Sequence, residues 1–144
     1  MTRATETVHT AWLIILGFVG QAAVWVAVLS QYGDSREIDG ACLGSVPDNA
    51  VMTGETPRFA ADITFLPIGR ACVYDATTGG TITVQTGQTV TLVAVAGTVV
   101  CLIAVVIAWS RWRRSTPMQR LLAGVALLFL VLGWLVIWLH AAMR

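Results

Sequence analysis

Three long apolar runs dominate the pattern of hydrophobic and polar positions along the chain. They cover residues 11–30, 90–109 and 121–139. Each run is close to the roughly 20 residues that a helix needs to cross a hydrocarbon core about 30 Å thick. The pattern therefore predicts three membrane-spanning helices. The remaining segments are 1–10, 31–89, 110–120 and 140–144.

The two connections between these helices differ in charge. Residues 31–89 contain seven acidic residues, three arginines and two cysteines. Residues 110–120 contain no acid and four arginines, which are Arg111, Arg113, Arg114 and Arg120. Short arginine-rich loops tend to stay in the cytoplasm. We therefore expect the N-terminus and 110–120 inside, and 31–89 and the C-terminus outside. In this prediction the arginines set the topology and attract anionic lipid headgroups.

Composition agrees with a membrane protein. The chain is 56% hydrophobic and 12% charged, whereas soluble domains are about 25% charged. The net charge of +1 gives no indication of a nucleic-acid partner. The first run is longer than the apolar part of a typical signal peptide, and residues 26–30 lack a good cleavage pattern. We expect it to be a retained helix.

Small residues recur along two of the predicted helices. In the first helix they are Gly17, Gly20, Ala23 and Ala27, and in the second they are Ala94, Gly97, Cys101 and Ala104. Helices in lipid associate through close van der Waals approach, so these rows are predicted packing seams. The third helix has Ala126 and Gly133 but is otherwise large and aliphatic, and we expect much of it to face lipid or a partner. Thr116 and Pro117 predict its start, as N-cap and first helical residue.

The connection 31–89 is too long for a structureless loop in a compact protein. Ala61, Ile63 and Phe65 alternate with polar or small residues, and a β-hairpin is predicted at about 71–86 with its turn at 77–80. Thr89 is the predicted cap of the second spanning helix. The fold class is thus a membrane all-α protein with three transmembrane helices. A small, disulfide-linked, β-rich extracytoplasmic domain is expected between the first and second helices.

Cys42 and Cys72 are the two cysteines outside the predicted spans. Thiols outside a bacterial plasma membrane tend to be oxidised, so the simplest prediction is a structural disulfide between them. A redox-active pair is the alternative, although the sequence lacks the Cys-x-x-Cys spacing that lowers a thiol pKa. Cys101 lies deep in a predicted span, beyond their reach, and is interpreted as a packing residue.

Candidate sites for chemistry are few. His9 and His140 are predicted at opposite membrane faces and cannot share a haem iron. Asp34, Glu37 and Asp39 are interpreted as a solvated run, with a weak divalent-cation contact as the alternative. No catalytic or phosphate-binding motif is present, so we predict no catalytic residues, cofactor or metal site. Gln21, which is polar and in mid-span, is expected to form an interhelical hydrogen bond, or else to contact a partner subunit, a lipid headgroup or a quinone-like ligand.

The segment Phe65–Tyr74 contains a Pro-x-Gly-x-x-Cys-x-aromatic sequence. It resembles a segment found in small integral membrane proteins of actinobacteria, where it lies in an exported loop between apolar spans. The absence of lysine agrees with such a source. The resemblance implies a folded exported loop and suggests no activity.

These observations favour a non-enzymatic integral protein of the bacterial plasma membrane. The leading hypothesis is an accessory or structural subunit of a larger cell-envelope membrane complex. Its partners would be the lipid bilayer and either other membrane protein subunits or further copies of the chain. The alternative hypothesis is an extracytoplasmic binding or sensing module displayed by a three-helix anchor.

Overall fold

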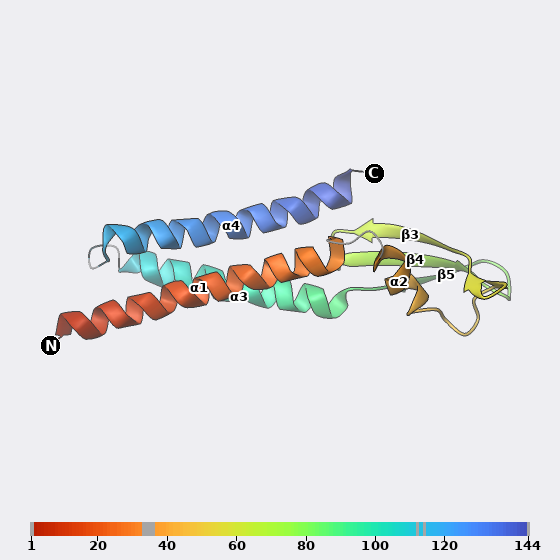
Figure 1. The fold of residues 1–144 in the computed structure, drawn as a ribbon, viewed down its shortest axis with the longest axis horizontal. Helices are drawn as coiled ribbons and strands as arrows, with labels where there is room; N and C mark the ends of the chain where they lie inside the picture. Colours follow the sequence, from red (N-terminus) through yellow and green to blue (C-terminus); the bar gives the residue numbers. More distant parts are fainter. Residues whose placement is uncertain (1, 33–36, 112, 114, 144) are drawn as a thin grey trace. The chain divides into compact units, whose positions relative to one another are not determined.

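A computed structural model describes residues 2–32, 37–111, 113 and 115–143 (Figure 1). Its elements are α1 (Thr2–Tyr32), α2 (Glu37–Leu43), β1 (Met52–Thr53), β2 (Thr56–Pro57), β3 (Phe59–Thr64), β4 (Gly69–Asp75), β5 (Thr81–Gln85), α3 (Gln88–Ser110) and α4 (Pro117–Ala142). They form two compact units. The helical unit comprises Met1–Val26 and Val93–Val136, and the β unit comprises Ala27–Leu92 and Ile137–Arg144.

Three helices in the described part of the chain are long and apolar enough to cross a membrane. They lie at Val8–Tyr32, Gln88–Ser110 and Pro117–Ala142. The prediction of three apolar spans is therefore confirmed, and the chain has the character of a multi-pass membrane protein. Each helix extends beyond its predicted run. In particular, α1 begins at Thr2, so most of the N-terminal segment 1–10 is helical.

Within the helical unit, α1 and α3 approach at backbone distance. A Cβ atom added at Gly20 would lie 2.5 Å from the Gly97 carbonyl oxygen and 2.8 Å from the Cys101 amide nitrogen. One added at Gly97 would lie 2.7 Å from the Ala23 Cβ. The buried residues of α3 are Ala94, Gly97, Cys101, Ala104, Val105 and Ala108. The small residues thus lie where the two helices touch, as close packing in lipid requires.

Helix α4 packs on this pair through small residues and two tryptophans. Ala123, Ala126 and Leu130 are buried. The Trp25 indole N–H donates to the Phe129 carbonyl oxygen at 3.0 Å, and the Trp134 indole N–H donates to the Thr98 hydroxyl at 2.9 Å. A polar group inside a bilayer needs an internal partner, so these bonds fix α4 as well as satisfying the indoles.

The start of α4 agrees with the predicted cap. Pro117 is its first residue. The Gln119 amide donates to the Thr116 hydroxyl at 3.3 Å, and the Thr116 amide donates to the Gln119 side-chain oxygen at 3.0 Å. This reciprocal pair is a capping box, and it satisfies two backbone donors at the helix end.

The β unit contains an antiparallel sheet in the order β3-β4-β5 (Figure 1). Strands β4 and β5 pair from Ala71↔Gln85 to Asp75↔Thr81, which confirms the predicted hairpin. Strand β3 pairs with β4 from Phe59↔Tyr74 to Thr64↔Gly69. The prediction that Phe65 continues this strand is wrong, because the chain turns after Thr64. The short helix α2 and the β1–β2 pair were not predicted.

The predicted helix cap at Thr89 is also wrong. Helix α3 begins one residue earlier, at Gln88. The Gly87 carbonyl accepts the Thr91 amide and the Thr91 hydroxyl, each at 2.9 Å. Gly87 has a φ of 85°, a conformation that glycine adopts without steric cost. The helix therefore starts from a glycine turn rather than from a threonine cap.

The close approach of α1 and α3 predicts that Gly20→Ala destabilises the protein. The added methyl group would overlap the backbone of α3, and overpacking of this kind costs about 1–3 kcal/mol. Gly17→Ala is the matched control, since its Cβ would meet Ala104 and Ala126 only at an ordinary 3.9 Å. Thermal unfolding in one detergent, followed by circular dichroism, should give a lower Tm for Gly20→Ala alone. Equal Tm values would contradict the packing.

Candidate functional site

The predicted disulfide between Cys42 and Cys72 is present. It joins the end of α2 to the middle of β4, with the two Cα atoms 5.7 Å apart and a sequence separation of 30. Closing a loop of this length stabilises a fold by roughly 3–4 kcal/mol in the chain-entropy model. Both cysteines are fully buried. Burial shields the bond from external thiols, which favours the structural interpretation over the redox-active one.

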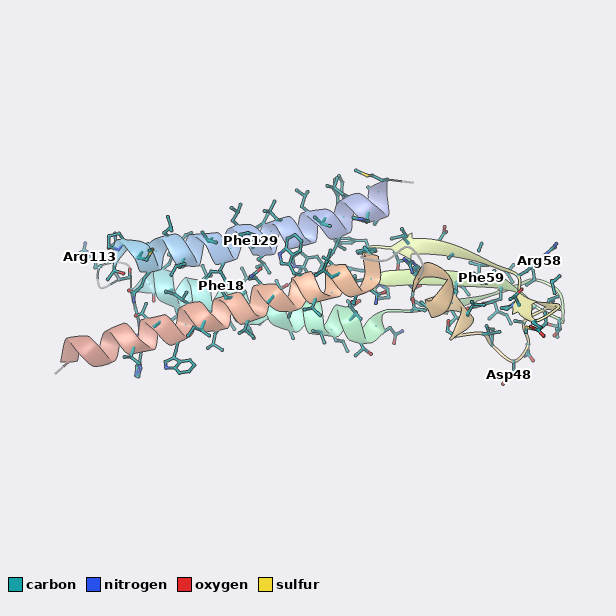
Figure 2. All side chains as sticks on the ribbon, in the orientation of Figure 1. Phe18, Asp48, Arg58, Phe59, Arg113 and Phe129 are labelled. Carbon is teal, nitrogen blue, oxygen red and sulfur yellow. A yellow bond between two sulfur atoms is a disulfide. The ribbon has the colours of Figure 1, made fainter. Side chains whose placement is uncertain are left out.

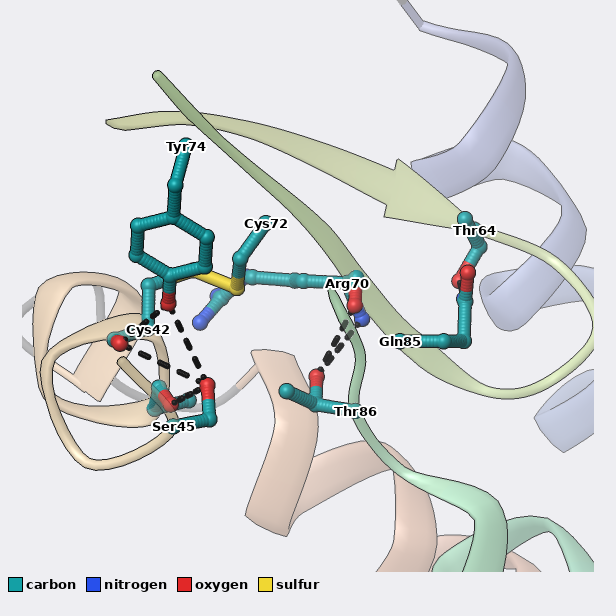
Figure 3. The surroundings of a disulfide bond; sticks show 9 residues. Cys42, Ser45, Thr64, Arg70, Cys72, Tyr74, Gln85 and Thr86 are labelled. Atoms are coloured by element: carbon teal, nitrogen blue, oxygen red, sulfur yellow. Dashed lines mark hydrogen bonds between the residues drawn. A yellow bond between two sulfur atoms is a disulfide. The ribbon is translucent and has the colours of Figure 1, made fainter. Parts of the chain in front are cut away.

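The disulfide lies in the core of the β unit (Figure 3). Ala50 and Tyr74 share this core, and Val46, Phe59, Ala61 and Val84 pack around it. The Tyr74 hydroxyl donates to the Cys42 carbonyl and lies 3.3 Å from the Ser45 hydroxyl. The tyrosine therefore joins the helix to the sheet at the same point as the disulfide does. A single small core holds α2 in place.

A second set of contacts joins the sheet to the end of α1. Arg70 on β4 is only 4% exposed, and its guanidinium donates to the Gln31 carbonyl oxygen at 3.2 Å. Its amide donates to the Thr86 hydroxyl at 3.1 Å, and Thr86 returns a bond to the Arg70 carbonyl at 3.0 Å (Figure 3). A positive charge is favourable at a helix C-terminus, where carbonyl groups are unpaired. Arg70 thus stabilises the end of α1.

The same end of the sheet contacts the start of α3. The Ile68 amide donates to the Thr91 hydroxyl at 2.6 Å. The backbones at Ile68 and Gly87 are so close that a Cβ atom at Gly87 would overlap the Ile68 carbonyl. We call the contacts of Ile68 and Arg70 with these helix ends the joint.

Tyr32 extends the joint to α4. Its hydroxyl donates to the Thr64 carbonyl at 3.4 Å, and its ring stacks on His140 with centroids 4.9 Å apart. The ends of all three spanning helices are thus represented in the β unit. The stack gives His140 a packing role beside Tyr32 within this unit.

The remaining predicted residues lie apart from the joint. Cys101 is free and buried, next to Gly20. The Gln21 side-chain oxygen is buried and accepts no hydrogen bond from the residues that the structure describes. The expected interhelical bond is thus not made by this atom. Ala27 is buried and belongs to the β unit.

The arginines of the short connection differ in their surroundings. Arg111 and Arg113 are exposed. Arg120 is half-buried and donates to the Ser115 carbonyl at 3.1 Å, so it also braces the start of α4. Arg114 lies outside the described residues, as do Asp34 and the side chains of Glu37 and Asp39. Among the described residues there is no group of three or more metal-ligating side chains.

The sheet face opposite the disulfide is open. Side chains alternate along a strand, so Val73 and Asp75 point away from the face of Cys72 and Tyr74. An open depression of about 620 Å³ lies here, with Arg58, Ala60 and Thr81 also in its lining. The charged residues Arg58 and Asp75 belong to its lining. The depression is a candidate binding surface of the β unit.

Comparison of the chain with models of protein families, with curated proteins and with solved structures found no match. A function for this chain can therefore be inferred only from its contacts and its exposed surfaces. Sequence reasoning missed the joint, because Arg70 and Thr91 have no distinctive spacing of their own. Two indirect features of the sequence mark the joint: Arg70 is a charged residue inside a β-rich stretch, and Thr91 lies one turn after Gly87.

The disulfide predicts a defined pattern of thiol labelling. Alkylation of the denatured protein should add one label without reductant, on Cys101, and three labels after reduction. Intact mass measurement distinguishes these states directly. Three labels in the unreduced protein would refute the pairing.

The joint predicts that Thr91→Val loosens the β3–β4 turn. Valine keeps the shape of threonine but leaves the Ile68 amide without an acceptor, at a cost of about 1–3 kcal/mol. Amide hydrogen exchange, read over residues 64–70 in detergent micelles, should become faster. Thr83→Val on the exposed face of β5 is the control and should leave the exchange unchanged. Equal exchange in both variants would show that the Thr91 bond does not hold the turn.

Proposed function

We propose that this chain is a non-enzymatic accessory or structural subunit of a larger membrane complex in the bacterial cell envelope. In this proposal the β unit lies outside the plasma membrane and the arginine-rich connection lies inside. The resemblance of Phe65–Tyr74 to exported loops of actinobacterial membrane proteins supports the same placement. The chain would contribute a fixed shape rather than a reaction.

The main support is the surface that the helices leave uncovered. In each spanning window 28% of the residues are buried within the chain, so most of each helix is available to lipid or to other proteins (Figure 2). The small-residue rows of α1 and α3 are already used, since they pack against each other. A partner helix would therefore need another surface.

Helix α4 presents such a surface. Leu121, Leu128 and Leu135 are 61%, 56% and 45% exposed and recur every seven residues. Val131, also exposed, lies between two of them. A seven-residue repeat keeps side chains on one side of a helix in a left-handed pair. We assign this leucine row as the contact with a helix of the partner subunit.

Native mass measurement after extraction in mild detergent tests the proposal. The unmodified chain should be found in a larger assembly, and the triple variant Leu121→Ala, Leu128→Ala, Leu135→Ala should release it. The control is Val99→Ala with Val106→Ala, which alters two exposed α3 residues at the same seven-residue spacing. A clean monomer of the unmodified chain at all concentrations would count strongly against the proposal.

Binding or sensing by the β unit is the second candidate, and the open depression on the sheet favours it. The same experiment separates the two functions. If the sheet face holds the partner, Ala60→Trp will fill the depression and release the assembly, whereas the leucine variant will retain it. Release by the leucine variant alone favours the accessory-subunit proposal.

A further inference from the structure

The turn between β3 and β4 exposes two adjacent large apolar side chains. Phe65 is 37% exposed and Leu66 is 57% exposed, while Ile68 in the same turn is fully buried. The Thr64 hydroxyl donates to the Pro67 carbonyl at 2.7 Å and accepts the Gln85 side-chain amide at 2.8 Å. The turn is therefore internally bonded and tied to the sheet, yet its tip presents an apolar surface.

The position of this turn follows from contacts within the β unit. The Ile68 amide donates a hydrogen bond to the Thr91 hydroxyl of α3. At the end of α1, the Tyr32 hydroxyl donates to the Thr64 carbonyl, and the Gln31 carbonyl accepts a hydrogen bond from Arg70. Figure 1 shows the β3–β4 turn beside the end of α1. The turn thus lies level with the ends of the spanning helices, at the opposite end of the sheet from β1 and β2.

The length of α3 gives the depth of the turn relative to the bilayer. Helix α3 has 23 residues, which at about 1.5 Å per residue is roughly 34 Å. A hydrocarbon core of about 30 Å leaves only a few ångströms of excess, shared between the two helix ends. Thr91 lies three residues inside the start of α3, about 4.5 Å along its axis. The Thr91 hydroxyl and the turn bonded to it therefore reach the boundary between headgroups and acyl chains.

We propose that Phe65 and Leu66 form a lipid anchor that inserts into this boundary of the membrane the helices cross. Aromatic and aliphatic side chains gain free energy there by leaving water, and the bonds to the Pro67 carbonyl and from the Ile68 amide satisfy two backbone groups of the turn. The occupant is the lipid of the same bilayer rather than a protein, because the joint holds the turn at the level of the helix ends. This inference does not depend on the proposed accessory role.

A fluorescent probe at position 66 tests the anchor. The variant Leu66→Cys, on a Cys101→Ala background with the native disulfide intact, is labelled with a nitrobenzoxadiazole probe and placed in phosphatidylcholine nanodiscs. We expect blue-shifted emission that lipids carrying a doxyl group near the top of the acyl chain quench strongly. Met52→Cys is the control, because Met52 is similarly exposed at 54% but lies on β1, and its probe should stay unquenched.

Each result decides the matter. Emission from position 66 that matches position 52 would place the turn in water and overturn the proposal. Blue-shifted emission without quenching would mean that protein covers the turn, which also overturns it.

The unmodified chain provides an independent measurement. In bilayers containing a photoactivatable phosphatidylcholine, irradiation followed by reduction of the disulfide and trypsin digestion should place lipid adducts on the peptide Phe59–Arg70. The neighbouring peptide Glu37–Arg58, which contains Met52, should carry none. Equal labelling of the two peptides, or none on Phe59–Arg70, would refute the anchor without relying on any variant.

Discussion

The structure depends on how backbone hydrogen bonds are satisfied where the helices end. A helix leaves four amide or carbonyl groups unpaired at each terminus, and water is scarce near the acyl chains. At the end of α1 the sheet provides a partner, because Arg70 donates to the carbonyl of Gln31. At the start of α3 the helix provides one instead, because the Thr91 hydroxyl accepts the Ile68 amide of the β3–β4 turn. The sheet and the helix ends each complete the bonding of the other, so neither is expected to be fully ordered alone.

Close packing imposes a different constraint on the helical unit. Lipid tails are as apolar as leucine, so burial of large side chains gives little driving force for helix association. Contact instead comes from Gly20 and Gly97, where the absence of side chains lets two backbones touch. The small residues are therefore covered by the neighbouring helix. Leu121, Leu128 and Leu135 of α4 remain exposed, so they are more accessible than the small-residue rows that are noticeable in the sequence.

Sequence patterns predicted those features that depend on composition or on local chemistry. Long apolar runs gave the spans, the pair Thr116-Pro117 gave the start of α4, and β-branched residues around a glycine turn gave the β4–β5 hairpin. Sequence patterns failed for features that tertiary contacts determine. Gly87 rather than Thr89 precedes α3, because its carbonyl accepts the Thr91 amide and its Cα lies against the Ile68 carbonyl, where a side chain would not fit.

The contacts and surfaces of the β unit were also predictable only in part. The disulfide was predictable, since only two cysteines lie outside the spans. Arg70 is a case in which reading the charge alone misleads, because an arginine in a polar connection suggests exposure. Its burial depends on a carbonyl at the end of α1, 39 residues away in the sequence. The exposed tip at Phe65 and Leu66 was likewise hidden, because the alternation of apolar residues suggested a continuing strand.

One face of β4 makes the contacts that hold the β unit together, and this leaves the opposite face exposed. Arg70, Cys72 and Tyr74 alternate along this strand, so they share a face, and each has a different partner: the end of α1, Cys42, and the Cys42 carbonyl. That face is fully engaged in holding the β unit together. The opposite face, with Val73 and Asp75, and the β3–β4 turn are fixed in position without being covered. The disulfide and hydrogen bonds of the engaged face therefore hold the exposed face and the turn in a defined arrangement, which is what recognition of lipid or protein needs.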